Sequence, residues 1–160
     1  MPAFTIRAAG PSDRPWITAV LTDAFAGPVQ VVRGKVYRAD ELPGFIAELE
    51  GKPAGLIAYR IEADRCDIMA LVSLEENRGI GTGLLAAVTE KARAAGCRRL
   101  RVVTTNDNQA ALRLYQKRGF RLVAVYVNSM EEARKLKPEI PLAGNDGIPL
   151  RDEIELEMPL

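Results

Sequence analysis

The chain has 160 residues, 48% of them hydrophobic and 27% charged, and a formal net charge of +1, which fits one domain over residues 1–160. The near-neutral charge argues against binding to nucleic acid or to a membrane surface. No apolar run reaches the ~20 residues of a spanning helix, and the N-terminus has no signal-peptide pattern. We therefore expect a soluble, cytoplasmic protein. The sequence has no histidine, which excludes imidazole bases, most zinc sites and the common nucleophilic triads. Cys66 and Cys97 form no Cys-x-x-Cys pair, and we expect both to be reduced core residues.

The first part of the chain predicts strands around one helix. In chain order, the pattern indicates a strand at residues 4–7, a helix from Ser12 or Asp13 toward Phe25, and two strands at 45–49 and 54–61 joined as a hairpin. Residues 29–43 show no clear period. A mostly apolar strand follows at residues 66–72.

The second part alternates helices with strands. In chain order, the pattern predicts a helix at residues 83–95, a strand at 100–104, a helix at 108–118, a strand at 120–127, a short basic helix at 130–137 and a loop at 138–149. Glycines follow the first two of these helices, as is common at helix ends.

The C-terminus alternates apolar residues with glutamates. Ile154, Leu156 and Met158 stand between Glu153, Glu155 and Glu157, which predicts a strand with one buried face and one solvent-exposed face. Together with the hairpin and the alternating units, this strand predicts an α/β domain with a mixed sheet.

The chemistry-bearing feature is the turn Arg78-Gly79-Ile80-Gly81-Thr82-Gly83, which lies between a strand and a helix. Backbone N–H groups at a helix start have no partner within the helix, and they form a site for a phosphate group with the helix dipole. Gly79 and Gly81 let the backbone approach such an anion. The same residues would suit a tight turn that binds nothing.

Other phosphate loops fit this turn less well. A dinucleotide fingerprint fails because Leu84 stands where its third glycine is needed, and no lysine completes a Walker A loop. A turn of an S-adenosylmethionine-dependent methyltransferase stays open as an alternative.

The turn resembles motif A of the GNAT acyltransferase superfamily, whose core is [Arg/Gln]-x-x-Gly-x-[Gly/Ala]. Two alignments fit, one with Arg78 at the first motif position and one with Glu76 there. We prefer the second, because it matches the family's Gly-Ile-Gly-Ser and places Gly96 at the helix end. The backbone cradle is the same in both.

A second stretch resembles the same family. Asn108, Ala111, Leu114 and Tyr115, with Gly119-Phe120 after them, match Asn-x-x-Ala-x-x-Leu-Tyr-x-x-x-Gly-Phe. A spacing of seven residues puts the Asn and the Tyr on one helix face, ~10 Å apart. The resemblance implies that the Asn contacts the pantetheine arm and that the Tyr protonates the departing thiolate. A purely core role is the alternative for this Tyr.

The resemblance spans nearly the whole chain and implies a GNAT-like mixed central sheet flanked by helices. It implies acetyl-CoA as cosubstrate, a primary amine on a small molecule or protein as acceptor, and direct attack in a ternary complex without metal. The implied cofactor-binding residues are Leu71, Val72, Ser73, Arg78, Gly79, Ile80, Gly81, Thr82, Gly83 and Asn108. A non-catalytic CoA-binding module and a homodimer remain open.

No motif fixes the general base. Asp67 is the candidate, because regular strand alternation would put it on the face of Met69 and Leu71, near the thioester. A structural Asp and a chain of water molecules are alternatives. Arg113 and Lys117 are candidates for contacting the 3′-phosphate, and the resemblance implies an acceptor pocket formed by residues 23–40 and 128–149.

Overall fold

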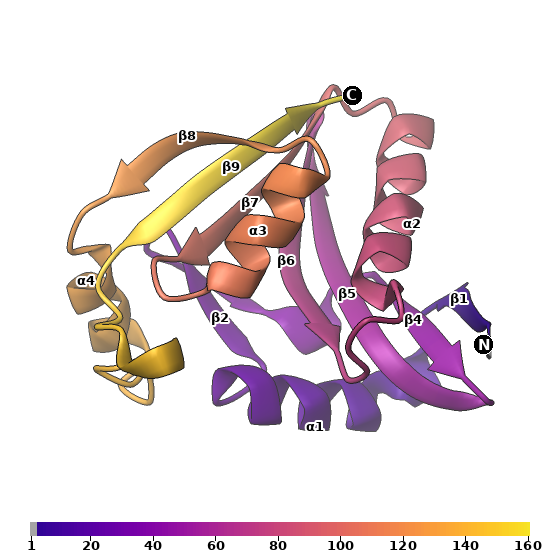
Figure 1. Ribbon diagram of the computed structural model, residues 1–160, viewed down its shortest axis with the longest axis horizontal. Helices are drawn as coiled ribbons and strands as arrows, with labels where there is room; N and C mark the ends of the chain where they lie inside the picture. Colours follow the sequence, from indigo (N-terminus) through magenta and orange to yellow (C-terminus); the bar gives the residue numbers. More distant parts are fainter. Residues whose placement is uncertain (1–2) are drawn as a thin grey trace.

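The computed structural model describes residues 3–160 and is built around a seven-stranded sheet (Figure 1). Its strands run in the order β1-β4-β5-β6-β7-β9-β8, and the β6–β7 pair is parallel while its other pairs are antiparallel. The bounds are β1 (Phe4–Ala8), β4 (Gly44–Leu49), β5 (Lys52–Glu62), β6 (Arg65–Ser73), β7 (Arg99–Thr105), β8 (Arg121–Tyr126) and β9 (Glu153–Pro159). The predicted mixed α/β class is confirmed.

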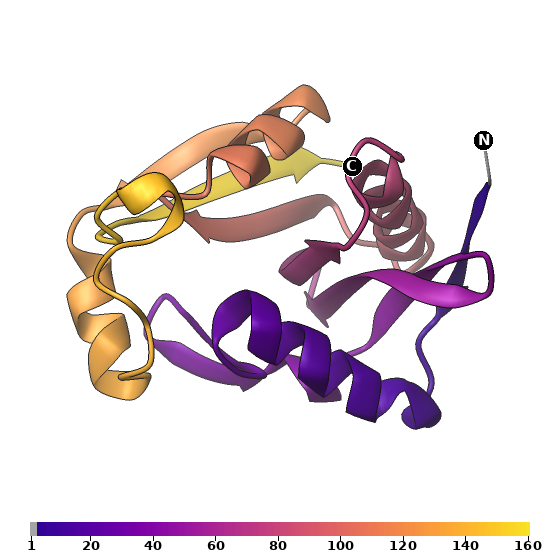
Figure 2. The same cartoon turned by 60° about the horizontal axis from the view of Figure 1, so that its bottom comes forward.

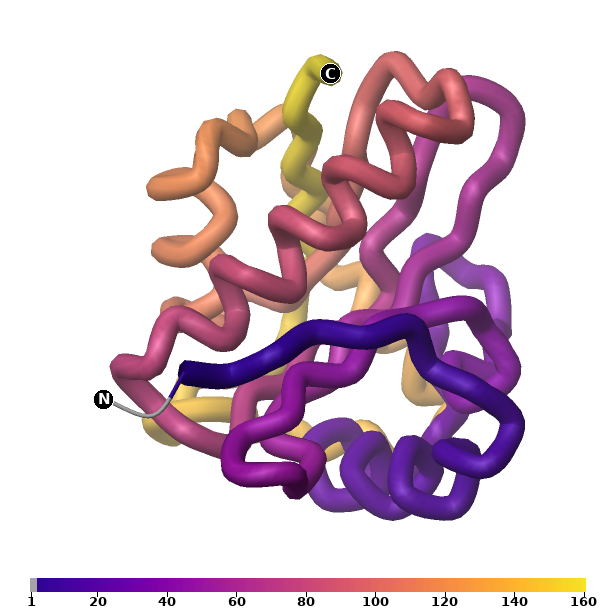
Figure 3. Tube along the Cα trace, turned by 90° about the vertical axis from the view of Figure 1, so that its right-hand side faces the viewer, coloured from indigo at the N-terminus to yellow at the C-terminus, as the bar shows by residue number. Residues whose placement is uncertain are grey.

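Helices cover both faces of this sheet. They are α1 (Arg14–Phe25), α2 (Ile80–Ala94), α3 (Gln109–Lys117) and α4 (Ser129–Leu136), with short 3-10 turns at Pro11–Asp13, Ala39–Glu41 and Asn145–Gly147. Figure 3 shows β1 and β4 between α2 and α1. Among residues 3–160, no helix combines the length and the apolar character needed to cross a bilayer.

Alternate residues of β5 divide the core between the two faces. Ile57 packs with Leu84 and Val88 of α2, whereas Leu56 packs on the opposite face with Leu21 of α1. This is the period of two that a buried strand requires. The predicted reduced cysteines lie in the α2 cluster, both free and buried, and burial raises the pKa of the Cys66 thiol to about 12.

Two tight hairpins shape the first half of the chain. The predicted hairpin is confirmed, with Glu50 and Gly51 as its turn, both at positive φ (53° and 76°). The unassigned segment forms a second hairpin of β2 (Val29–Val32) and β3 (Lys35–Arg38), whose turn residues Arg33 and Gly34 repeat that geometry (φ 48° and 78°). An arginine in the left-handed region gives a weak turn signal, which explains the missing prediction.

Two sequence predictions of local structure are wrong. Helix α2 begins at Ile80 rather than at residue 83, because Gly79 caps it in the left-handed conformation (φ 76°). The glutamate face of β9 is not uniformly exposed, since Glu153 is buried and Glu155 half-buried. This strand lies between β7 and β8, and basic side chains cover its polar face.

An ion pair anchors β1 to the start of α1, and it predicts a pH-dependent stability. Arg7 donates two hydrogen bonds of 2.8 Å to Asp13. These bonds, with one from the Gly10 N–H, lower the pKa of Asp13 to about 2. A carboxyl group with a depressed pKa in the folded state stabilises the fold above its unfolded pKa of about 4, and this contribution is lost as the pH falls toward 2.

We therefore expect Asp13→Asn to lower the urea midpoint at pH 7, and the difference from the parent protein to shrink between about pH 4 and pH 2. The exposed Asp23 provides the control, since Asp23→Asn should leave the midpoint nearly unchanged. A deficit in Asp13→Asn that stays constant over this range would contradict the linkage.

Candidate active site

The two central parallel strands pair over only part of their length. Their register runs from Arg65↔Arg99 to Ile68↔Val102, although β6 continues to Ser73 and β7 to Thr105. Beyond the last pair the two parts of the sheet diverge (Figure 2), and a cavity of about 630 Å³ opens between them. We call it the central cavity. Within residues 3–160 no strand pairs with the edge of β6 that faces it, so an extended ligand can pair there as an added strand.

Most of the predicted cofactor residues line this central cavity. The structure brings together Leu71, Ser73, Gly79, Ile80, Gly81, Thr82, Asn108 and Tyr115. Val72, Arg78 and Gly83 do not line it. The exposed Arg113 and Lys117 of α3 do not line it either.

The start of α2 supplies hydrogen-bond donors to the cavity. The Gly83 N–H closes the first turn on the Gly79 carbonyl at 2.9 Å, so the N–H groups of Ile80, Gly81 and Thr82 have no partner within the helix. All three residues line the cavity, where the positive end of the helix dipole also lies. This arrangement suits a phosphate or pyrophosphate group.

The absence of a side chain has a different consequence at Gly81 than at Gly83. A Cβ on Gly81 would meet only the Leu114 Cδ2 atom, at 3.5 Å, so this position has room toward the cavity. A Cβ on Gly83 would meet the Phe4 ring at 2.8 Å, so Gly83 allows α2 to pack against β1. The side chain of Val72 packs in the cluster on the α1 face, because it alternates with those of Leu71 and Ser73.

Helix α3 presents Asn108 and Tyr115 to the central cavity. Asn108 is the N-cap of this helix, and its side-chain oxygen accepts a hydrogen bond from the Ala111 N–H at 3.1 Å. Its amide group keeps two donors for other partners. Tyr115 is buried, with its ring edge-on to Phe120 at 5.1 Å between centroids. Burial raises the pKa of Tyr115 well above its ordinary value, so the phenol keeps its proton.

The prediction that Asp67 shares a strand face with Leu71 is wrong, although Asp67 and Met69 line the same cavity. Met69 is an extra residue in β6, because Ala70 pairs with Ala58 while Ile68 pairs with Tyr59. Such a bulge reverses the alternation, so Asp67 and Leu71 lie on opposite faces. Asp67 does not line the central cavity, and both its carboxylate oxygens accept hydrogen bonds from Arg65, at 2.7 and 3.1 Å.

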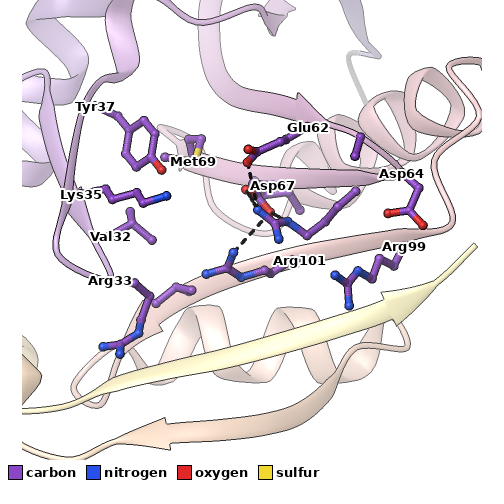
Figure 4. A pocket seen from close by; sticks show the side chains of 14 residues that line it. Val32, Arg33, Lys35, Tyr37, Glu62, Asp64, Asp67, Met69, Arg99 and Arg101 are labelled. Carbon is purple, nitrogen blue, oxygen red and sulfur yellow. Dashed lines mark hydrogen bonds and ion pairs between the residues drawn. The ribbon is translucent and has the colours of Figure 1, made fainter.

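Asp67 lies instead in a second cavity, of about 500 Å³, which we call the charged cavity (Figure 4). Strands β6 and β7 and the β2–β3 hairpin form its walls. The two cavities share four lining residues, Val32, Ile68, Met69 and Val103. They therefore adjoin at the point where the sheet divides.

Two polar residues of the central cavity have no counterpart in the sequence prediction. Glu153 is buried, and its carboxylate accepts hydrogen bonds from the backbone N–H of Arg33 at 3.1 Å and from its guanidinium at 3.2 Å. Gln30 of β2 also lines the cavity, and its buried Nε2 atom has no hydrogen-bond partner in the part of the chain that the structure describes. Glu153 belongs to the strand face that the alternation placed in solvent, and Gln30 to the unassigned segment.

The sequence is similar to one large enzyme family. Residues 14–120 match the profile of the Acetyltransferase (GNAT) family. The chain is also 48% identical over 140 residues to the uncharacterized protein YdhI of Bacillus subtilis (strain 168), an alignment that covers 84% of this chain and 88% of the relative.

Solved structures share the fold at low sequence identity. An IAA acetyltransferase from Bacillus cereus ATCC 14579 superposes with a TM-score of 0.73 at 23% identity, over 99% of this chain and 100% of that chain. A GNAT family acetyltransferase from Elizabethkingia anophelis, solved with acetyl-CoA bound, gives a TM-score of 0.71 at 23% identity over 100% of both chains.

Proposed function

This chain belongs to the GNAT acetyltransferase family, and from that membership we propose that it transfers the acetyl group of acetyl-CoA to a primary amine. One observation carries the proposal. The free N–H groups at the start of α2, the unpaired edge of β6 and the Tyr115 side chain all border the central cavity. A cavity of this composition offers donors to a pyrophosphate, a strand edge to an amide-containing arm, and a proton where that arm ends.

Each group then has a role that follows from its position. Acetyl-CoA, when bound, supplies the activated acyl group and the thiolate leaving group. The N–H groups of Ile80, Gly81 and Thr82 bind the pyrophosphate, and Asn108 donates to the pantetheine arm. Tyr115 gives its phenolic proton to the sulfur that leaves, and burial keeps that proton on the phenol until then.

We propose Glu153 rather than Asp67 as the group that draws the proton from the amine. Both carboxylates accept hydrogen bonds from an arginine, so the strength of their pairing does not separate them. Their positions separate them, because Glu153 lines the same cavity as Tyr115, whereas Asp67 lies in the charged cavity.

Amine-dependent release of CoA thiol from acetyl-CoA tests the proposal. We expect the protein to bind acetyl-CoA in a calorimetric titration and to release thiol with at least one class of primary amine. Acetyl-CoA binding without release for any amine would favour the non-catalytic module. The methyltransferase alternative is wrong, since the fold and the family are those of acetyltransferases.

Gly81 gives the sharpest test of the phosphate cradle. We expect Gly81→Val to weaken CoA binding by well over about tenfold, because its side chain would occupy the space that the phosphates approach. A Cβ at this position makes only an ordinary contact, so we expect the variant to fold, and its melting temperature checks this. Calorimetry measures the affinity.

Gly83→Ala is the matched control for Gly81. Its Cβ would collide with Phe4, so we expect a lower melting temperature but little change in CoA affinity for the folded protein. Unchanged CoA affinity in Gly81→Val would contradict the assignment of the cradle.

A further inference from the structure

The charged cavity carries information about the acceptor. Five basic and three acidic residues line it: Arg33, Lys35, Arg65, Arg99 and Arg101, and Glu62, Asp64 and Asp67. Figure 4 shows Arg99 and Arg101 extending from β7, and Lys35 and Tyr37 on the opposite wall. Basic residues therefore outnumber acidic ones in the lining, and Arg33, Arg99 and Arg101 pair with glutamates of β9 that lie outside it.

The acidic residues of this cavity are largely neutralised already. Arg65 holds Asp67 with two hydrogen bonds, at 2.7 and 3.1 Å. Glu62 accepts a hydrogen bond of 2.6 Å from Arg60 and lies 3.4 Å from Arg65. Asp64 is exposed at the rim. These pairings leave little negative charge to repel an anion.

Among the arginines that line the charged cavity, Arg101 has the least satisfied hydrogen bonding. Its Nε atom lies 3.4 Å from a Glu155 oxygen and its Nη1 atom 3.9 Å from an Asp67 oxygen, and its side chain is only 16% exposed. The buried Nε atom forms this ion pair but no hydrogen bond to any of residues 3–160. A guanidinium has five donors, and leaving them unsatisfied in a buried site costs free energy. A carboxylate or phosphate group would satisfy them in a two-point contact.

Lys35 is a second cation available to a ligand. It lines the cavity from the hairpin side and forms no ion pair among residues 3–160. A flexible ammonium group on one wall and a planar guanidinium on the other can hold an anionic group between them.

The charged cavity also lies beside the reaction centre of the proposed function. It meets the central cavity at Met69 and Val103. Arg101 stands two residues before Val103 on the same face of β7, about 7 Å away along the strand. An amine placed at the junction would therefore have Arg101 within reach of a group a few atoms along its chain.

We propose that the acceptor is a primary amine that also carries an anionic group, a carboxylate, phosphate or sulfonate, bound by Arg101 with Lys35. This inference rests on the proposed acetyl transfer and adds a substrate class to it. Arg101 and Lys35 act as specificity-determining residues and take no part in proton transfer.

Matched pairs of amines test the inference. We would measure thiol release with 4-aminobutyrate against 4-aminobutanamide, 2-aminoethyl phosphate against ethanolamine, and taurine against ethylamine. For the parent protein we expect kcat/KM to favour at least one anionic amine by about 10- to 100-fold, the effect of hydrogen bonds to a charged group. The pair with the largest ratio identifies the type of anion.

Two variants localise the preference. Arg101→Gln and the milder surface change Lys35→Gln should each reduce it, chiefly through a higher KM for the anionic amine, while the neutral partner is acetylated as before. Arg93→Gln is the matched control, because Arg93 lies on α2 and pairs with Glu90 outside both cavities. Saturation-transfer NMR of 4-aminobutyrate with the CoA-bound protein gives a readout without turnover, and its signal should fall in Arg101→Gln.

Outcomes against the inference differ from those against the proposed function. Acetylation of neutral amines with equal or better kcat/KM would overturn the anionic acceptor while leaving acetyl transfer intact. A preference for anionic amines that survives in both cavity variants would overturn the assignment to this site. Acetyl-CoA binding without acetylation of any amine would overturn both.

Discussion

Tyr115→Phe is expected to lower kcat by roughly 10- to 1000-fold, the range for loss of a general acid, with acetyl-CoA affinity nearly unchanged. The ring would keep its edge-on packing against Phe120, so the variant removes the phenolic proton and little else. Steady-state kinetics with a rate-limiting chemical step measures the loss. Because burial keeps this phenol protonated, the loss should be the same across neutral pH.

Tyr59→Phe is the control for this experiment. Tyr59 is also buried, and desolvation also raises its pKa, but it stacks on Phe45 away from both cavities. We expect its kcat to match that of the parent. An unchanged kcat in Tyr115→Phe would show that the Tyr115 hydroxyl group is not needed for catalysis and that the side chain only packs in the core.

Glu153→Gln is expected to reduce kcat/KM by about 100-fold near neutral pH, the low end for a positioned base. The loss should shrink as the pH rises toward the pKa of the acceptor amine, since more of the amine then arrives deprotonated. Acetyl-CoA affinity should change little. A kcat/KM profile against pH measures both effects.

Asp67→Asn is the matched comparison for Glu153→Gln. We expect a smaller loss, one that does not depend on pH, because Asp67 lies in the charged cavity rather than beside Tyr115. A larger and pH-dependent loss in Asp67→Asn would restore Asp67 as the base. Equal losses at every pH in Glu153→Gln would indicate that Glu153 only positions the Arg33 turn.

Local sequence signals were enough to predict most of the sheet and one wall of the site. Glycines that end helices, alternating apolar residues and the two motifs identify the secondary structure, the α2 turn and the face of α3 that carries Asn108 and Tyr115. These features depend on residues close together in the chain, where propensity and spacing act directly.

The remaining features depend on contacts between distant segments. The extra residue Met69 cannot be recognised from the local sequence, since only the pairing of β6 with β5 shows that the register shifts there. Glu153 resembles any solvent-facing glutamate until Arg33, 120 residues earlier in the chain, covers it. The turn at Arg33 and Gly34 is recognised by its positive φ angles, which the residue type of Arg33 does not predict.

The short ladder between β6 and β7 has a thermodynamic consequence. Four residue pairs join the two parts of the sheet, all at one end of the strands. A molecule bound in the central cavity contacts both parts of the sheet, so it binds the folded state and not the unfolded chain. A ligand present at a hundred times its dissociation constant adds about 2.7 kcal/mol to the free energy of unfolding, so the melting temperature should rise with the concentration of any molecule that binds in this cavity.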